Sequence, residues 1–351
     1  MSYGGTAPNW LQKTLHYDVE YDKWRSPLGD KTRMAPCEIA LEFRQFIDPF
    51  MNAVWASLPP QPTVHSIHYD VIVSHDGLTI SVRRFGTTEQ LSGPETPEAA
   101  SSILAPALLY VHGGGMVAVS VYIVAPQMRQ LAALSGVQVF AVAYRLASEH
   151  PAPTPAEDVY AALSWMHARA ADLGIHRARI GVIGDSAGCG LAAATALMAR
   201  DQGLNPPLKR LILVYPMLDD RAAAKLLSDF ASAAATGEPP PPLIGFATFP
   251  LQSIRVRWRA YLGLGAGHDN AEFSPYAAPG RVSDLRGLPA SYLGVGELDL
   301  FRDECVSFAQ RLAAANVEVE FHLLPGLPRR LGLRGALWRA GFGGFVDYEG
   351  E

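Results

Sequence analysis

Residues 179–200 read RIGVIGDSAGCGLAAATALMAR, and this stretch decides the fold. Its apolar first part is typical of a buried strand, and the Ala- and Leu-rich run that begins at Ser186 is typical of a helix. Only the segment from Gly184 to Gly188 separates the two. Glycines suit so tight a turn because they bring no Cβ against the neighbouring backbone. We therefore predict a strand, a sharp turn with Ser186 at its tip, and a helix.

This strand–turn–helix context is what a G-x-S-x-G nucleophile elbow requires. Ser186 is then the candidate nucleophile, raised on the turn and followed directly by a helix. The helix N-terminus would stabilise negative charge that develops beside the serine. A chance match is the alternative for so short a motif, but its position between an apolar strand and a helix argues against chance.

A second glycine-rich segment lies earlier in the chain. Residues 112–115 read HGGG and directly follow the apolar run ALLYV at 107–111. Glycines allow a backbone to approach a substrate closely, and an HGGG loop after an early strand can lend its N–H groups to an oxyanion. We predict that the N–H groups of Gly113, Gly114 and Ala187 form an oxyanion hole. His112 is expected to orient the loop.

Continuous apolar runs alternate with helical patterns outward from these motifs, for example QVFAVAY, KRLILVYP and ASYLGVG. This alternation indicates a mostly parallel central sheet with helices on both faces, hence the α/β fold class. Residues 1–62 are amphipathic and helical, and residues 221–265, with a proline run, interrupt the alternation. We expect these two segments to form a helical cap, as packing helices or as a lid. The core would comprise residues 63–220 and 266–351.

Composition limits the function classes. The 351 residues are 49% hydrophobic and carry a formal net charge of -5, which argues against a nucleic-acid partner. Cys37, Cys189 and Cys305 are few and far apart, so neither a disulfide framework nor a zinc site is expected, and a reducing compartment fits best. No segment approaches the ~20 apolar residues of a membrane span. We expect a soluble, cytoplasmic protein with no membrane partner.

Successive segments of the chain, from about residue 65 to residue 328, resemble in order the motifs of the hormone-sensitive-lipase-like carboxylesterases. The segments are HGGGM, YRLASEHPAPTPAEDVYAALSWM, GDSAG, YPMLDDR, SPYAAP and LPASYLGVGELDLFRDE. The resemblance implies an eight-stranded α/β-hydrolase fold with a helical cap, and esterase activity on small or medium acyl esters. It implies no cofactor and no metal, and leaves a homodimer possible. Ser148 and Cys189 depart from the family's usual Pro and Gly.

The resemblance also assigns the acid of a catalytic triad. Asp299 follows the apolar run ASYLGVG and stands at the family's triad-acid position. Asp303 and Glu304 would open the next helix, where acidic side chains favour the helix dipole. The chain order of serine, acid and base also fits this fold. Three other acids, Asp185, Asp219 and Asp220, are expected to be structural.

The triad base is absent from its expected position. The family carries it after the next strand, in a pattern like PGxPHGF, but residues 325–331 here read PGLPRRL. Arg329 therefore stands where the histidine should be, and a guanidinium that stays protonated cannot act as a general base. His322 is the only histidine after Asp299, and its place within the preceding strand makes it a weak substitute.

Two interpretations of this departure remain open. In one, the base is truly lost, and the fold serves as a ligand-binding or biosynthetic accessory protein. The gibberellin receptor, which resembles the same family and lacks the catalytic histidine, is such a case. In the other, the reading frame shifts near Pro328, because the family pattern stops there. Possible codons for residues 328–339, read from the second base, encode His-Gly-Val-Trp-Asp-Tyr-Ala-Ala-His-Ser-Gly. We favour the second interpretation.

Overall fold

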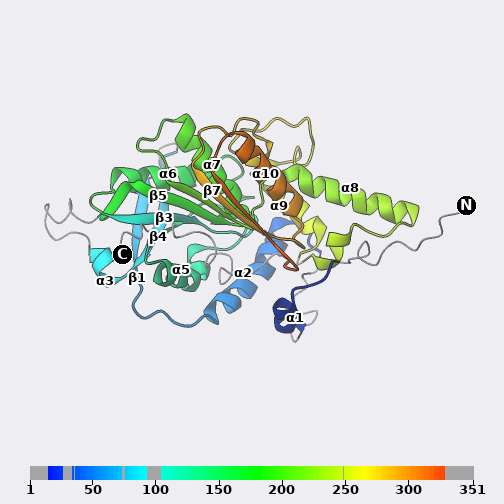
Figure 1. Cartoon of the computed structure of the whole chain (residues 1–351), viewed down its shortest axis with the longest axis horizontal. Helices are drawn as coiled ribbons and strands as arrows, with labels where there is room; N and C mark the ends of the chain where they lie inside the picture. Colours follow the sequence, from blue (N-terminus) through cyan, green and yellow to red (C-terminus); the bar gives the residue numbers. More distant parts are fainter. Residues whose placement is uncertain are drawn as a thin grey trace, which may run out of the picture.

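The chain is built around one eight-stranded, mostly parallel sheet (Figure 1). The computed structural model describes residues 15–26, 34, 36–72, 76–92, 104–247 and 249–328. The strand order is β1-β2-β4-β3-β5-β6-β7-β8. β2 is antiparallel to both β1 and β4, and all other neighbours are parallel. The predicted α/β fold class is confirmed.

The strands are short, as the apolar runs of the sequence indicate. They are β1 (His65–Ile72), β2 (Thr79–Gly86), β3 (Ala105–Val111), β4 (Gln138–Ala143), β5 (Ile175–Asp185), β6 (Arg210–Val214), β7 (Ala290–Gly296) and β8 (Val319–Leu324). In the central strand β3, every residue from Ala107 to Val111 is fully buried. Continuous burial of this kind follows from helices on both faces of the sheet, and it explains the unbroken apolar runs.

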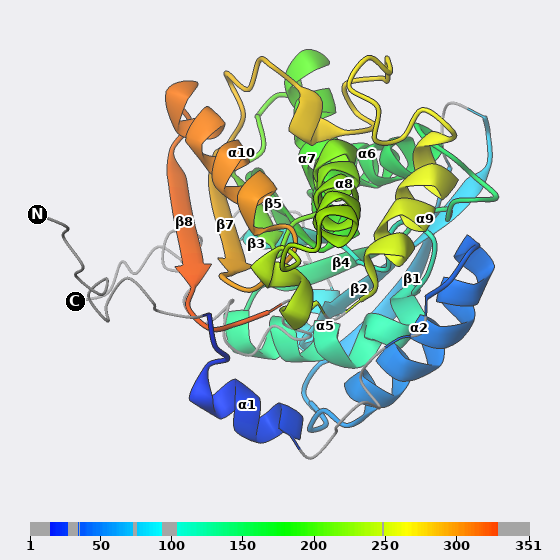
Figure 2. The ribbon, with the colours of Figure 1, turned by 90° about the vertical axis from the view of Figure 1, so that its right-hand side faces the viewer.

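Helices cover both faces of this sheet. α5 lies on one face, whereas α6, α7 and α10 lie on the other (Figures 1 and 2). The described helices are α1 (Val19–Arg25), α2 (Ala40–Ala56), α3 (Thr88–Ser92), α5 (Val121–Ser135), α6 (Thr154–Ala168), α7 (Ala187–Asp201), α8 (Asp220–Thr236), α9 (Leu251–Leu262) and α10 (Arg302–Ala314), with short 3-10 helices η3 (Pro242–Phe246) and η4 (Pro279–Arg281).

Two helices from the predicted cap segments lie beside the carboxyl edge of the sheet. α2 buries a stripe of side chains at helical spacing, formed by Phe43, Ile47, Met51 and Trp55. The same four side chains line a hollow that also contains Ser186. α9, from the second segment, packs near α2 and lines the same hollow (Figure 2). The exact cap boundaries at residues 62, 221 and 265 stay a prediction.

A buried ion pair fastens the loop after β4 to α6. Asp158 is fully buried on α6. Its carboxylate accepts a bidentate pair of hydrogen bonds from the guanidinium of Arg145, one from Nε at 2.9 Å and one from Nη2 at 2.7 Å. It also accepts the backbone N–H of Arg145 at 2.9 Å. The remaining guanidinium nitrogen pairs with Asp76 near β2. One carboxylate therefore holds the turn that leads from the sheet into α6.

Asp158→Asn should lower the free energy of unfolding by about 3 kcal/mol, because it leaves a mostly buried guanidinium without its main counter-charge. Chemical denaturation followed by circular dichroism measures the change. Asp172→Asn is the matched control: its carboxylate pairs with Arg169 at the same 2.7 Å, but both side chains are more than half exposed. That control should cost less than about 0.5 kcal/mol. Equal losses in both variants would contradict this account.

Candidate active site

Ser186 sits on a strained turn that the neighbouring backbone holds in place. β5 ends at Asp185 and α7 begins at Ala187, one residue later than the helix predicted from Ser186. Ser186 has φ 56° and ψ -121°, a conformation that costs a non-glycine residue about 1–3 kcal/mol. Its N–H donates to the carbonyl of Val214 at 3.0 Å, and its carbonyl accepts the N–H of Met217 at 3.0 Å. These bonds from the β6 side fix the turn.

Close packing explains the glycine at the end of the motif. A Cβ on Gly188 would lie 2.1 Å from the carbonyl oxygen of Val111, at the end of β3. The start of α7 therefore lies directly against the strand that leads into the HGGG loop. Any side chain at position 188 would push the nucleophile away from this loop.

The HGGG loop lies against the nucleophile. An added Cβ on Gly113 would be 3.0 Å from the Cβ of Ser186. Gly114 has φ 107°, and a Cβ there would be 2.1 Å from the carbonyl oxygen of Ala118. That same segment folds back on the loop, since the N–H of Ala118 donates to the carbonyl of Gly114 at 3.1 Å. The structure thus brings the predicted oxyanion donors beside Ser186.

Two buried, stacked rings, those of His112 and Tyr144, support the HGGG loop from the interior of the protein. His112 is 1% exposed, and its ring stacks on that of Tyr144 with centroids 4.3 Å apart. His112 Nδ1 lies 2.7 Å from the carbonyl oxygen of Gly113, and the Tyr144 hydroxyl donates to the carbonyl of His112 at 2.8 Å. Burial lowers the pKa of His112 to about 4. The neutral ring then donates from Nδ1 to Gly113 and holds the loop, the orienting role that its position suggested.

Asp185, the residue before the nucleophile, is also held by aromatic side chains. The hydroxyls of Tyr110 and Tyr215 each donate to its carboxylate, at 3.1 Å. Burial, followed by the negative charge of Asp185, raises the pKa of Tyr110 well above its usual value. Asp185 is thus part of the framework under the elbow, in line with the structural role expected for it.

Asp299 lies in the loop after β7 and is 2% exposed. Its Oδ1 accepts the backbone N–H of Phe301 at 3.0 Å, which orients the carboxylate within the loop. Asp299 lines a small hollow with Phe249, and Phe249 also lines the hollow that contains Ser186. Phe249 therefore borders both the space in front of the candidate acid and the space in front of the candidate nucleophile.

The other candidate acids have partners elsewhere. Asp303 pairs with Arg302 at the surface, and Glu304 accepts the backbone N–H of Leu218 at 2.7 Å. Both lie in the first turn of α10, as expected. Asp219 caps α8, and Asp220 forms a buried pair with Arg281 at 2.7 Å.

The loop after β8 runs beside the loop of Asp299. The N–H of Leu298 donates to the carbonyl of Leu327 at 2.9 Å, and the N–H of Glu297 donates to that of Leu324 at 2.9 Å. Leu298 directly precedes Asp299, so position 327 is tied next to the candidate acid. Arg329, two residues further on, lies outside the described residues.

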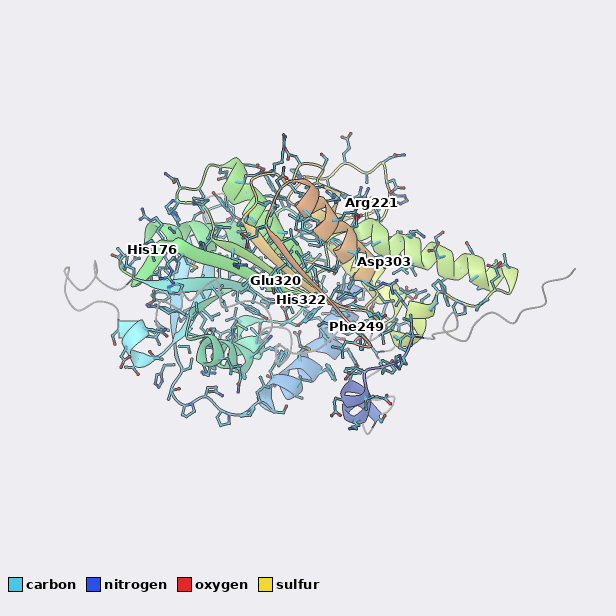
Figure 3. The ribbon with its side chains drawn as sticks, viewed as in Figure 1. His176, Arg221, Phe249, Asp303, Glu320 and His322 are labelled. Atoms are coloured by element: carbon cyan, nitrogen blue, oxygen red, sulfur yellow. The ribbon has the colours of Figure 1, made fainter. Side chains whose placement is uncertain are left out.

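His322 contacts side chains of the sheet itself. It lies on β8 opposite Gly294, before the carboxyl end of the strand. Its Nε2 lies 2.8 Å from the carboxylate of Glu320, and both residues are labelled in Figure 3. The ring centroid of His322 lies 5.3 Å from that of Tyr292 on β7. These contacts hold the imidazole beside side chains of β7 and β8 on one face of the sheet, and they give no support to His322 as a base for Ser186.

The hollow in front of Ser186 is mostly apolar. It encloses about 480 Å³ of atom-free space, part of it open to solvent. Its walls come from the HGGG loop, the elbow, and helices α2, α5 and α9. The lining residues are Phe43, Ile47, Met51, Trp55, Gly113, Gly114, Val119, Val124, Asp185, Ser186, Tyr215, Phe249 and Arg257. Within the described ranges, no group of three or more His, Cys, Asp or Glu side chains could hold a metal ion.

Comparison with known proteins agrees with this geometry. The profile of the α/β hydrolase fold family matches residues 108–330. Esterase LipI of Mycobacterium tuberculosis is 33% identical over 287 residues, 81% of this chain and 82% of that protein. Carboxylesterase NlhH of the same species is 34% identical over 216 residues, 61% of this chain and 63% of that protein. The solved structure of a bacterial heroin esterase matches with TM-score 0.73 and 31% identity, covering 93% of each chain.

The fold, the elbow and the loop define an α/β hydrolase. With relatives of this identity and coverage, the chain belongs to the hormone-sensitive-lipase-like carboxylesterases, a family of carboxylic ester hydrolases. The resemblance noted in the sequence is thereby confirmed.

Sequence reasoning missed several residues of the hollow, among them Phe249 and Arg257. Arg257 was detectable, because Leu251, Ile254, Trp258 and Tyr261 define the buried face of a helix, and Arg257 falls on that face. Phe249 lies in an irregular segment before α9, where no periodicity exists to place it.

The pKa of His112 predicts a pH dependence of stability. The unfolded ring titrates near 6.5 and the folded ring near 4, so the unfolded state binds more protons between these values. Stability should therefore fall as pH falls from about 6.5 toward 4, by about 2 kcal/mol between pH 7 and pH 5 from this group. His112→Asn, which keeps a donor toward Gly113, should lose this component in denaturation measured at the two pH values. If the stability of the variant depends on pH as much as that of the unchanged chain, His112 is not the cause of the pH dependence.

Gly114→Ala should disable the oxyanion loop, because its Cβ would overlap the carbonyl of Ala118 and its φ is positive. Labelling of Ser186 by a fluorophosphonate, which needs the same oxyanion donors, should slow by about 10²-fold. Gly136→Ala is the matched control: φ is also positive, but an added Cβ meets nothing within 4 Å. The control should label at the rate of the unchanged chain, and an equal slowing would contradict the role of the loop.

Proposed function

We propose that this protein is a serine carboxylesterase that acts through an acyl-Ser186 intermediate on small or medium acyl esters. One observation carries the proposal: the strained Ser186 backbone holds its side chain against the HGGG loop, at the wall of a mostly apolar hollow. A strained nucleophile turn beside convergent backbone donors is the arrangement that acyl transfer needs.

Each residue has a distinct part in the proposed reaction. Ser186 Oγ attacks the ester carbonyl, and the N–H groups of Gly113, Gly114 and Ala187 stabilise the oxyanion that forms. In the family mechanism, a histidine at position 329 takes the serine proton and passes it to the leaving alcohol, while Asp299 holds the imidazole. Water then releases the acyl group by the same steps in reverse order.

The substrate class follows from the hollow. Its walls are predominantly Phe, Ile, Met, Trp and Val side chains, which favour an apolar acyl chain. The names of the relatives, esterase and carboxylesterase, support this substrate class.

The second candidate function is a binding protein that retains a small ligand without turnover. The observation that favours it is Arg329 at the position of the base. In the part of the chain that the structure describes, the residues that line the hollow all lie between Phe43 and Arg257, so a ligand site can persist where catalysis does not. Tight retention of a ligand without hydrolysis would distinguish this function from esterase activity.

We also propose a cellular location, a class of partner and an oligomeric state for the protein. Cys37, Cys189 and Cys305 are buried thiols, and this supports a cytoplasmic location. The negative net charge supports small molecules, and not nucleic acid, as partners. A homodimer stays a proposal from the resemblance. Among the described helices, none has the length and apolar character needed to cross a bilayer.

The chain with Arg329 should hydrolyse p-nitrophenyl butyrate slowly, since a missing triad member costs several orders of magnitude in rate. Arg329→His should raise kcat/KM by about 10²-fold or more, because it restores a histidine at the position where the family carries the triad base. Steady-state hydrolysis of p-nitrophenyl butyrate measures the gain, and Ser186→Ala added to this variant should abolish it.

Arg330→His is the matched control, with the same substitution one position along, and should give no gain. Hydrolysis by the unchanged chain at a typical esterase rate, abolished by Ser186→Ala, would contradict the loss of activity expected from Arg329 and would require a base other than a histidine at position 329. His322, the only other histidine after Asp299, would then be tested by His322→Gln. Sequencing the transcript across codons 327–339 then separates a shifted reading frame from a true loss of histidine.

A further inference from the structure

Two arginines from different elements contact the same buried aromatic ring. Arg83 lies on β2 and Arg129 on α5, which packs against β2, and both side chains are half-buried. Their guanidinium carbons each lie 5.9 Å from the ring centroid of Phe85, which has no exposed surface. Two positive charges therefore share one aromatic ring.

A second ring extends this arrangement toward solvent. The guanidinium carbon of Arg83 also lies 5.4 Å from the ring centroid of Tyr122, whose side chain is 70% exposed. Tyr122 and Arg129 are seven residues apart on α5, which places them on one face of the helix about two turns apart. Rings and guanidinium groups thus alternate in the order Tyr122, Arg83, Phe85 and Arg129, and these four residues form an arginine ladder.

The ladder holds hydrogen-bond donors without protein partners. Arg83 Nε donates to Ser66 Oγ at 3.2 Å. Its two terminal nitrogens, and all three nitrogens of Arg129, donate to no protein atom in the ranges that the structure describes. Arg129 is the only charged residue of α5, so no carboxylate reaches it from the next turn of the helix. By contrast, the partly buried Arg44 pairs with Glu149 at 2.6 Å.

The two guanidinium groups also repel each other. Burial, followed by the positive charge of Arg83, lowers the pKa of Arg129. An aromatic ring attracts a cation but does not neutralise it, and arginine stays protonated at any working pH. An anion bound between the two groups would offset both the repulsion and the partial loss of solvent.

The chemistry of the donors favours a phosphoryl group over a carboxylate. One guanidinium fork already satisfies both oxygens of a carboxylate. A phosphoryl group offers three strong acceptor oxygens and carries a charge of about -1.5 to -2 near neutral pH. It can therefore accept hydrogen bonds from two forks at once, and Arg83 and Arg129 supply two forks from separate elements.

We propose that the arginine ladder is a binding site for a phosphoryl group, with the free nitrogens of Arg83 and Arg129 as its donors. The site is separate from the hollow in front of Ser186. α5 lines that hollow with Val124, which lies about 200° around the helix from Tyr122. A ligand on the ladder therefore leaves the hollow open.

Isothermal titration calorimetry of the full chain with inorganic phosphate tests the site, at constant ionic strength and near neutral pH. Phosphate should bind at a single site, at least about tenfold more tightly than acetate, because acetate offers only one carboxylate to the two forks. Equal affinities for the two anions, or no binding of phosphate, would overturn the proposal. This comparison needs no substitution in the ladder.

Arg83→Gln and Arg129→Gln should each weaken phosphate binding by about tenfold, because each removes charge-assisted hydrogen bonds. Arg259→Gln is the matched control. It removes the same charge from an exposed arginine of α9 that also lacks a carboxylate partner among the described residues, and it should bind phosphate like the unchanged chain. If the control weakens binding as much as the ladder variants, or if neither ladder variant weakens it, the ladder is not the site and the proposal fails.

Vesicle sedimentation distinguishes the two sources of a phosphoryl group, a lipid headgroup and a soluble molecule. If a headgroup is the ligand, vesicles of phosphatidylcholine with phosphatidic acid should pellet the chain, vesicles of phosphatidylcholine alone should not, and both ladder variants should stay in the supernatant. Phosphate binding by a chain that stays in the supernatant with both vesicles assigns the site to soluble phosphorylated molecules. Absence of phosphate binding and of sedimentation would refute the site, whatever the esterase activity proves to be.

Discussion

The structure depends on the strained turn at Ser186. A serine with φ 56° is stable only where its surroundings over-determine it, and here three chain segments do so. β6 supplies the carbonyl of Val214 and the chain beyond it supplies the N–H of Met217, while β3 packs against Gly188 with no space for a side chain. The order of the central strands follows from this need, because β3, β5 and β6 must lie side by side for the elbow to close.

The neighbouring strands of the same sheet place other parts of the site. β3 leads into the HGGG loop, which His112 and Tyr144 support from the interior of the protein. The carboxyl ends of parallel strands share one edge, so residues far apart in the chain converge in front of Ser186. The helices α2 and α9 then close the space with apolar side chains and one buried cation. Rigid backbone thus positions the reacting groups, whereas the covering helices determine what can bind.

Much of this was predictable from the sequence, for physical reasons. The strand–turn–helix pattern around Ser186 and the glycines after β3 are local signals, since backbone geometry at a tight turn leaves few residue choices. The hollow was less predictable. Phe43 and Ile47 were recognisable only as part of one face of an amphipathic helix, and neither Phe249 nor Arg257 carries a motif, because pocket walls are selected by shape and not by backbone demands. For the triad base, the sequence predicts only a position. The family pattern marks position 329, and this chain carries arginine there in place of histidine.

The hydrogen bond between Leu298 and Leu327 has a consequence for how this edge of the sheet tolerates substitution. It joins two backbone groups, so its geometry does not depend on which side chains these positions carry. Proline at position 298 is the exception, because it has no N–H to donate. The side chains of these two loops can therefore change during evolution while the backbone that carries Asp299 keeps its place beside the chain that leaves β8.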